Sequence, residues 1–256
     1  MANSTHRRTT RTALVSVGVL ATIVILFHII GLAAQGTSAP DHSNFTDCQA
    51  CHAETYKMWV GTKHGKAADS LVACIACHKP GSSDYPKQLV NDVEKLCGGC
   101  HTQRAVLEGK GARGIEDTRS FHSGVRCVSC HMSEANHDLK LFRPDDPAIP
   151  EDRLDTCTRC HSDNNRKMRA KQIQDWFDFY KEAMDPIEAD MAMISAAIKE
   201  KPDLLNADLK SKWDTINFNL SIIVSDGSRG AHNLDFSLEI MAKVAKDIKE
   251  IKAAIK

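Results

Sequence analysis

The pentapeptide Cys48-Gln49-Ala50-Cys51-His52 opens a stretch in which the pattern Cys-x-x-Cys-His is written five times. The other copies span 74–78, 97–101, 127–131 and 157–161, and together the five copies use all ten cysteines of the chain. This is the attachment pattern of c-type haem, in which two thiols bond to the porphyrin and the next imidazole binds the iron from one face. The sequence therefore predicts five covalently bound haem c groups. The predicted attachment residues are Cys48, Cys51, Cys74, Cys77, Cys97, Cys100, Cys127, Cys130, Cys157 and Cys160, and the predicted proximal iron ligands are His52, His78, His101, His131 and His161.

Other chemistries use paired cysteines. One Cys-x-x-Cys can be half of a zinc site, a redox dithiol or part of a disulfide framework. None of these requires histidine directly after the second cysteine. Histidine is only 12 of 256 residues, so five chance matches have a probability on the order of 10⁻⁷ beside the motif rule itself. The repeat favours haem.

Length and composition limit the fold. A chain of 256 residues holds one to two domains. Only 5% of residues are aromatic, so the core of an ordinary domain would be thin, and we expect the porphyrins to fill it and folding to depend on haem insertion. The formal net charge is zero before any haem propionate is counted, and nothing in the charge pattern suggests nucleic acid.

The N-terminal part has the pattern of a membrane anchor. Residues 13–34 form a 22-residue apolar run, and a helix needs about 20 such residues to cross a bilayer. Arg7, Arg8 and Arg11 precede the run and predict a cytoplasmic N-terminus with the body outside, on the periplasmic side of the cytoplasmic membrane. A cleaved signal peptide is the alternative, although its apolar region usually runs only about 7–15 residues.

The predicted fold is mainly α. It comprises a cytoplasmic N-terminus (1–12), a transmembrane helix (13–34), a linker (35–46), a loop-rich pentahaem domain with short helices (47–165) and a C-terminal bundle of long helices (166–256). No alternation long enough for a sheet is present. Apolar spacing predicts long helices over 166–199, over 204–224 and from about Leu234, with Pro186 inside the first and a turn at 226–230. Their apolar faces would pack on the haem domain, on each other or across a dimer.

The second axial ligand of each iron decides what the haem does. A protein ligand there gives a low-spin electron carrier, and a vacancy gives a substrate site. Seven histidines lie outside the motifs; His6 falls on the cytoplasmic side and His28 in the apolar run. Five remain, which equals the number of irons: His42, His64, His122, His137 and His232. We predict these as distal ligands, with Met58 and Met132 as substitutes for His42. The sequence does not assign a histidine to a haem.

Several stretches resemble one superfamily. The run from Cys48 through Tyr56, Trp59 and His64-Gly65 to Cys74 is similar to multihaem cytochromes related to ammonia-forming nitrite reductase and the octahaem reductases. So are His131-Met132 with His137 and Pro144, and the segment 226–233, which resembles the Gly-x-His-Asn element before the final long helix, whose histidine commonly ligates a haem. The nitrite reductases have one motif ending in Lys, with an open iron, whereas all five motifs here end in His.

Three functions follow. The leading hypothesis is a membrane-anchored pentahaem cytochrome that transfers electrons in respiration between the quinone pool, or a quinol-oxidising membrane complex, and an extracytoplasmic redox partner. Under this hypothesis the protein is an electron-transfer protein, or an electron-transfer subunit of an oxidoreductase, and not itself an enzyme. The alternative is a reductase or oxidase of a small nitrogen or sulfur compound, which needs one open iron. The third is an assembly role, with the C-terminal helices forming a dimer or docking on a partner.

Overall fold

The computed structural model describes residues 48–67, 73–81, 83–150, 153–161 and 165–255. The predicted membrane segment 13–34, the linker and His42 lie outside these residues. Within them, no helix is long and apolar enough to cross a membrane. The described residues belong to one unit, Asp47–Lys256.

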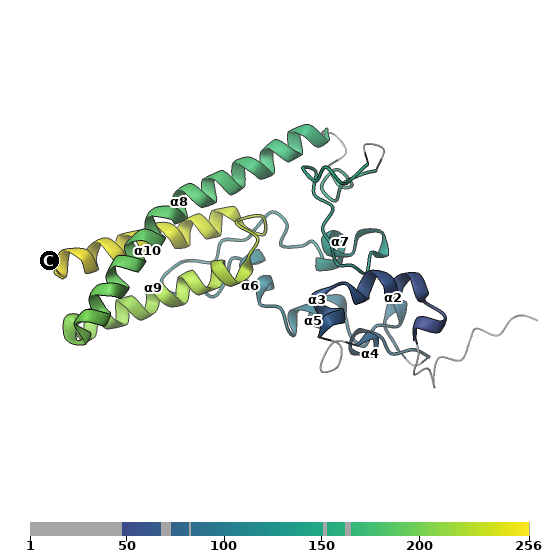
Figure 1. Cartoon of the computed structure of the whole chain (residues 1–256), viewed down its shortest axis with the longest axis horizontal. Coiled ribbons are helices and arrows are strands. Elements are labelled where there is room, and N and C mark those ends of the chain that lie inside the picture. Colours follow the sequence, from purple (N-terminus) through teal and green to yellow (C-terminus); the bar gives the residue numbers. More distant parts are fainter. Residues whose placement is uncertain (1–47, 68–72, 82, 151–152, 162–164, 256) are drawn as a thin grey trace, which may run out of the picture. The chain divides into compact units, whose positions relative to one another are not determined.

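The haem-motif region is built from short helices joined by loops (Figure 1). In chain order they are η1 (Cys48–Ala50), α2 (Ala53–Val60), α3 (Lys63–Lys66), α4 (Cys74–Cys77), η2 (Pro86–Gln88), α5 (Val93–Gly98), α6 (Gln103–Leu107), α7 (Cys127–His131) and η3 (Ser133–Ala135). Among the described residues, β pairing is limited to an isolated bridge between His78 and Leu89. The prediction of a mainly α fold with short helices at the motifs is confirmed.

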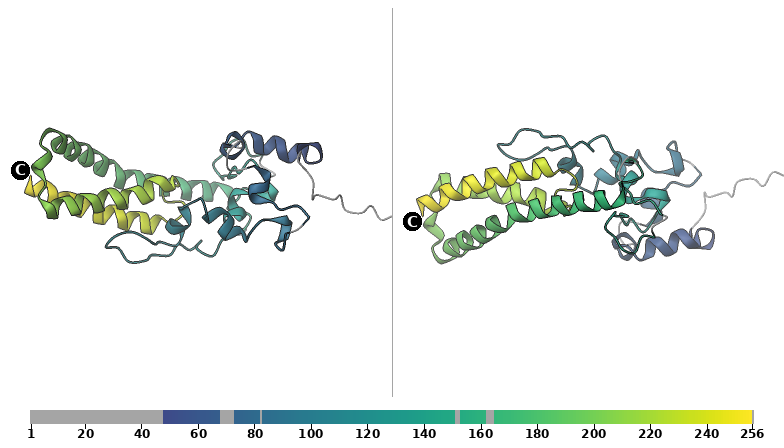
Figure 2. Two further views of the ribbon diagram at one scale, coloured as in Figure 1. Left: turned by 90° about the horizontal axis from the view of Figure 1, so that it is seen from below. Right: turned by 90° about the horizontal axis from the view of Figure 1, so that it is seen from above.

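Three long helices follow, and the last of them packs against both of the others (Figures 1 and 2). They are α8 (Arg166–Glu200), α9 (Ala207–Asp226) and α10 (Leu234–Ala254), with the short η4 (Pro202–Leu204) between the first two. Each begins after an asparagine whose side-chain oxygen accepts a hydrogen bond from a backbone N–H three residues on. Such caps satisfy donors that have no partner inside the helix. The predicted second helix therefore starts three residues late, because Asn206 caps it while Pro202–Leu204 forms the separate turn.

The core of the bundle is aliphatic. Ile194 of α8, Ile216 of α9 and Phe236, Ile240 and Val244 of α10 are fully buried. Each such side chain stabilises the fold by about 1.5–3 kcal/mol through removal of apolar surface from water. Of the three packing arrangements considered from the sequence, the structure has the helices packed on each other, with Val106 of α6 joining the same cluster.

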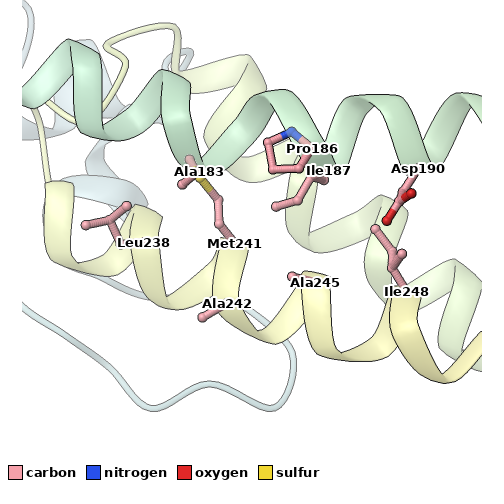
Figure 3. A pocket seen from close by; sticks show the side chains of 9 residues that line it. All are labelled: Ala183, Pro186, Ile187, Asp190, Leu238, Met241, Ala242, Ala245 and Ile248. Carbon is pink, nitrogen blue, oxygen red and sulfur yellow. The ribbon is translucent and has the colours of Figure 1, made fainter.

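Pro186 lies inside α8, and α8 continues through it as one helix of 35 residues. Proline lacks the N–H that would bond the carbonyl four residues earlier. Beside it, small residues of α8 and α10 leave an apolar groove of about 300 Å³ (Figure 3). At one end of the groove Asp190 accepts a hydrogen bond from Lys252, at 2.6 Å. The lining contains no haem motif residue.

Two buried asparagines tie the haem-motif region to the bundle. Asn219 of α9 accepts a hydrogen bond from the backbone N–H of Arg113 (2.8 Å) and donates one to the carbonyl of the same residue (3.0 Å). Asn233, the cap of α10, donates to the carbonyls of Val106 (3.1 Å) and Thr118 (2.6 Å). Buried amides are costly unless they are hydrogen-bonded. These bonds therefore fix the segment between the third and fourth motifs against the end of the bundle from which His232 projects.

Candidate haem sites

Each motif forms about one helical turn. The backbone N–H of the motif histidine donates to the carbonyl of the first cysteine in four copies: His52 to Cys48 (2.9 Å), His78 to Cys74 (2.8 Å), His101 to Cys97 (2.9 Å) and His161 to Cys157 (3.0 Å). The fourth copy is the helix α7 itself. Residues three and four apart lie on one face of a helix. Both sulfurs and the imidazole can therefore reach one porphyrin, and none of the ten cysteines forms a disulfide.

A buried carboxylate shapes the fifth motif. Asp155 is 1% exposed, and its Oδ1 accepts hydrogen bonds from the N–H groups of Cys157 and Thr158, both at 2.9 Å. Its Oδ2 accepts from the Thr158 hydroxyl at 2.6 Å. This is the bonding of a helix N-cap. It explains how Cys157–His161 forms a turn outside any long helix, and it is a supporting residue that the sequence analysis missed.

Four motif histidines each face one of the predicted distal histidines. The ring centres are 5.8 Å apart for His64 and His101, 6.2 Å for His78 and His137, 6.0 Å for His122 and His161, and 6.2 Å for His131 and His232. We call these the third, second, fifth and fourth pairs, after their motifs. Metal–imidazole bonds of about 2 Å on both sides of one ion put the ring centres about 6 Å apart. The residues present therefore fit an iron held between two imidazoles at each pair.

Local hydrogen bonds present His64. The Thr62 hydroxyl caps α3: it accepts from the Gly65 N–H (2.9 Å) and donates to the Trp59 carbonyl (2.7 Å). Gly65 lies so close to α2 that a Cβ there would be 2.4 Å from the Trp59 oxygen. α3 can therefore approach α2 only because residue 65 is glycine.

Tight turns present His122 and His137. The His122 N–H donates to the Ser120 hydroxyl (3.0 Å), and its carbonyl accepts from Val125 (2.8 Å). His137 follows η3, where Ala135 has a positive φ of 57°, and its Nδ1 donates to the Ala135 carbonyl at 2.8 Å. A hydrogen bond at Nδ1 leaves Nε2 as the ligating atom and fixes the ring orientation.

His232 is held by the turn between α9 and α10. Its N–H donates to the Ser228 hydroxyl (3.1 Å), and its Nδ1 donates to the Asp226 carboxylate at 2.6 Å. The guanidinium of Arg229 packs on the Phe177 ring of α8, 4.1 Å from the ring centre. The sequence predicted both the turn and His232, but not the role of Asp226. An aspartate followed two residues later by a serine is typical of a turn closed by side-chain hydrogen bonds. This pattern could have drawn attention to Asp226.

The electrostatic surroundings keep several of these imidazoles neutral. Desolvation, and then the neighbouring His101, lowers the pKa of His64. Desolvation also lowers the pKa of His122, and His161 and Arg169 add to the effect. The pKa of His78 is lowered by desolvation, partly offset by its hydrogen bond to the Lys87 carbonyl. Neutral imidazole is the form that ligates a metal.

Cysteines of successive motifs lie next to one another. Cys74 contacts Cys48, Cys77 neighbours Cys100, and Cys97 contacts Cys127. In the same way Cys130 neighbours both Cys157 and Cys160. In the free thiol form, desolvation, followed by the neighbouring cysteines Cys127 and Cys77, raises the pKa of Cys97 to about 11. Thioether bonds to haem would abolish the ionisation of these thiols but would not change which cysteines are neighbours. The five attachment sites therefore follow one another in space in the same order as in the sequence.

The remaining predicted site residues are placed as follows. His42, proposed from the sequence as a distal ligand, lies outside the described residues. Its substitutes are described: Met58 is 36% exposed on α2, and Met132 follows α7 directly. The assignment of these residues as iron ligands stays a prediction. The structure adds which distal histidine faces which motif histidine, which the sequence did not give.

Comparisons with known proteins identify the family of this chain. The family model described as Cytochrome c552 matches residues 118–256, which is 139 of the 256 residues. This chain belongs to the cytochrome c552 family. A second model, Cytochrome c554 and c-prime, matches residues 47–132 of this family member. The chain is thus a multihaem c-type cytochrome with several covalent haem c groups, and its ten cysteines are consistent with five.

Individual relatives agree. Cytochrome c-554 of Nitrosomonas europaea is 33% identical over 89 residues, covering 33% of this chain and 35% of that protein. Outer Cell Wall Cytochrome OcwA has a similar fold, with a TM-score of 0.57 and 21% identity, over 76% of this chain and 50% of its own. The undecahaem cytochrome from the S-layer of Carboxydothermus ferrireducens gives 0.51 and 18%, over 77% and 36%. This c552-family chain therefore spans between a third and a half of the length of these relatives.

Proposed function

We propose that this cytochrome is an electron carrier in which five haem c groups form a relay and each iron is held by two histidines. Four facing imidazole pairs at 5.8–6.2 Å carry the proposal. When bound, each haem supplies a one-electron iron couple. With haem bound, an imidazole on each side would fill both axial positions of the iron, leave no place for a small substrate and favour a low-spin iron. This is the ligation of an electron-transfer haem.

The chain's own residues set the order of the relay. The attachment cysteines of motifs one and two, two and three, three and four, and four and five are neighbours. The motif histidine His52 lies close enough to His78, and His101 close enough to His131, to contribute to lowering the pKa of His78 and of His131. Porphyrins bonded at these positions would have adjacent edges, which short-range electron transfer requires. We propose that electrons pass in motif order between the first and fifth haems.

The donor and acceptor are proposed from the sequence. The apolar run 13–34 after Arg7, Arg8 and Arg11 would anchor the chain in the cytoplasmic membrane with its haems on the extracytoplasmic side. The first haem motif follows this run by only 13 residues, which suits electron exchange with quinol or a quinol-oxidising subunit. The fifth haem, at the other end of the proposed relay, would exchange electrons with an extracytoplasmic redox protein. Two relatives are named as outer cell wall and S-layer cytochromes, in line with a body outside the cytoplasm.

Small-ligand reactivity tests the electron-carrier proposal. We expect nitrite, hydroxylamine and carbon monoxide to leave the visible spectrum of the reduced holoprotein unchanged, and we expect no catalytic turnover with a viologen donor. A bis-histidine iron offers these ligands no free position. The His232→Ala variant is the positive control, since its opened iron should bind carbon monoxide. Turnover of nitrite or hydroxylamine by the wild-type protein would favour the enzyme hypothesis instead.

A further inference from the structure

The second and fourth imidazole pairs differ in what the ligands donate to. In the second pair, Nδ1 of His78 bonds the Lys87 carbonyl (3.1 Å) and Nδ1 of His137 bonds the Ala135 carbonyl (2.8 Å). In the fourth pair, the Leu139 backbone lies close enough to His131 to offset part of the lowering of its pKa by desolvation. His232 instead bonds Oδ1 of Asp226 at 2.6 Å. Of these four imidazoles, only His232 has a carboxylate partner.

The surroundings of Asp226 keep its charge buried and directed at the ligand. Its side chain is 2% exposed at the end of α9. Its second oxygen accepts hydrogen bonds from the backbone N–H and the hydroxyl of Ser228. Tyr180 of α8 is near enough that, after desolvation, the Asp226 charge contributes to raising the Tyr180 pKa to about 12. A charge removed from water is little screened and acts strongly on its neighbours.

We propose that Asp226 lowers the reduction potential of the fourth haem, acting through His232 as a positioning and tuning residue. The inference rests on the proposed ligation of that haem by His131 and His232. A carboxylate that accepts the Nδ1 proton makes the imidazole a stronger electron donor, and outer partners of metal ligands tune the metal in this way. The buried negative charge further disfavours the added electron of the reduced iron. Both effects have the same sign.

This assignment gives the relay an internal step. The fourth attachment site has cysteines of the third and the fifth sites as neighbours, so a haem bonded there would lie between the third and fifth haems. A lower reduction potential means that the fourth haem would give up an electron more readily than it would without Asp226. The second haem, whose ligands bond only backbone carbonyls, would lack this effect. Asp226 thereby sets where along the relay electrons are held at equilibrium.

The test is a potentiometric titration of the Asp226→Asn holoprotein. Asparagine keeps the size and the acceptor oxygen but removes the charge. We expect one of the five couples to become easier to reduce by at least about tenfold in its equilibrium constant, which is 59 mV for a one-electron couple. Its electron paramagnetic resonance signal should move but stay low-spin. Asp247→Asn is the matched control, because Asp247 is also buried but pairs with Lys243 in α10; it should leave all potentials unchanged.

Two further variants separate the possible failures. Ser228→Ala removes a hydroxyl that donates a hydrogen bond to the Asp226 carboxylate. The negative charge on the carboxylate would then act more strongly on His232, so the same couple should become harder to reduce. This second variant still tests the proposal if Asp226→Asn loses haem. Unchanged potentials in both variants, with His232→Ala still producing a high-spin iron, would overturn the role of Asp226 alone. If His232→Ala leaves every iron low-spin, the ligation on which the inference rests is wrong.

Discussion

Replacing His232 by alanine is expected to convert the fourth haem from low-spin to high-spin while the other four stay low-spin. His232 faces His131 with 6.2 Å between the ring centres, and alanine offers no replacement ligand. An iron with one axial histidine and an open position is high-spin or water-bound. Electron paramagnetic resonance with spin quantification should give a high-spin fraction near one haem in five, and that fraction should respond to cyanide.

The pairing itself is tested by combining variants. Removing the fourth attachment site with Cys127→Ser and Cys130→Ser should leave four haems, and His232→Ala in that background should then add no high-spin signal. Effects that share one target fail to add, and this failure identifies the shared target. The matched control removes the second site, Cys74 and Cys77, where His232→Ala should still open the fourth iron. A high-spin signal that survives loss of the fourth site would contradict the pairing.

Substitution of Gly65 by alanine should displace His64 and open the third haem. A Cβ at residue 65 would lie 2.4 Å from the Trp59 oxygen and 2.6 Å from the Val60 Cα. Both are backbone atoms, so α3 must move away from α2 and take His64 from its position 5.8 Å from His101. Forcing an extra methyl group into a packed contact costs about 1–3 kcal/mol. We expect a lower melting temperature and a new high-spin fraction.

Gly61→Ala is the matched control for Gly65→Ala. Gly61 lies four residues earlier, with a φ of −74°, and its Cβ would meet nothing nearer than the Met58 oxygen at 3.9 Å. An alanine there should leave haem content, spin state and melting temperature close to those of the wild type. Wild-type spectra in both glycine variants would show that the close approach of α2 and α3 does not set the position of His64.

The long helices were predictable because their signals are local. An apolar stripe and the turn at 226–230 place α8, α9 and α10 within a few residues of their observed bounds. The first helix was predicted to run through Pro186 although proline disfavours a helix interior, and α8 does continue there because Met184 and Ile187, on either side of it, are buried in the core. Tertiary packing overrides the local preference there.

The site was predictable in its parts but not in its arrangement. Five motifs fix the cysteines and proximal histidines by spacing alone. Which distal histidine faces which motif depends on contacts over long separations, such as Asn233 with Val106 and His131 with His232, and no local pattern encodes them. Asp226 and Asp155 were missed for a related reason: their roles come from burial and from the hydrogen bonds they accept.

The most direct test of a five-haem bis-histidine relay is an electron paramagnetic resonance spectrum of the oxidised protein, with iron quantified against protein, before and after nitrite or hydroxylamine is added. We predict five irons per chain, all low-spin, and no response to either additive. A high-spin fraction near one haem in five that shifts on addition would contradict the account, because it would mean that one iron lacks its distal histidine and is open to substrate.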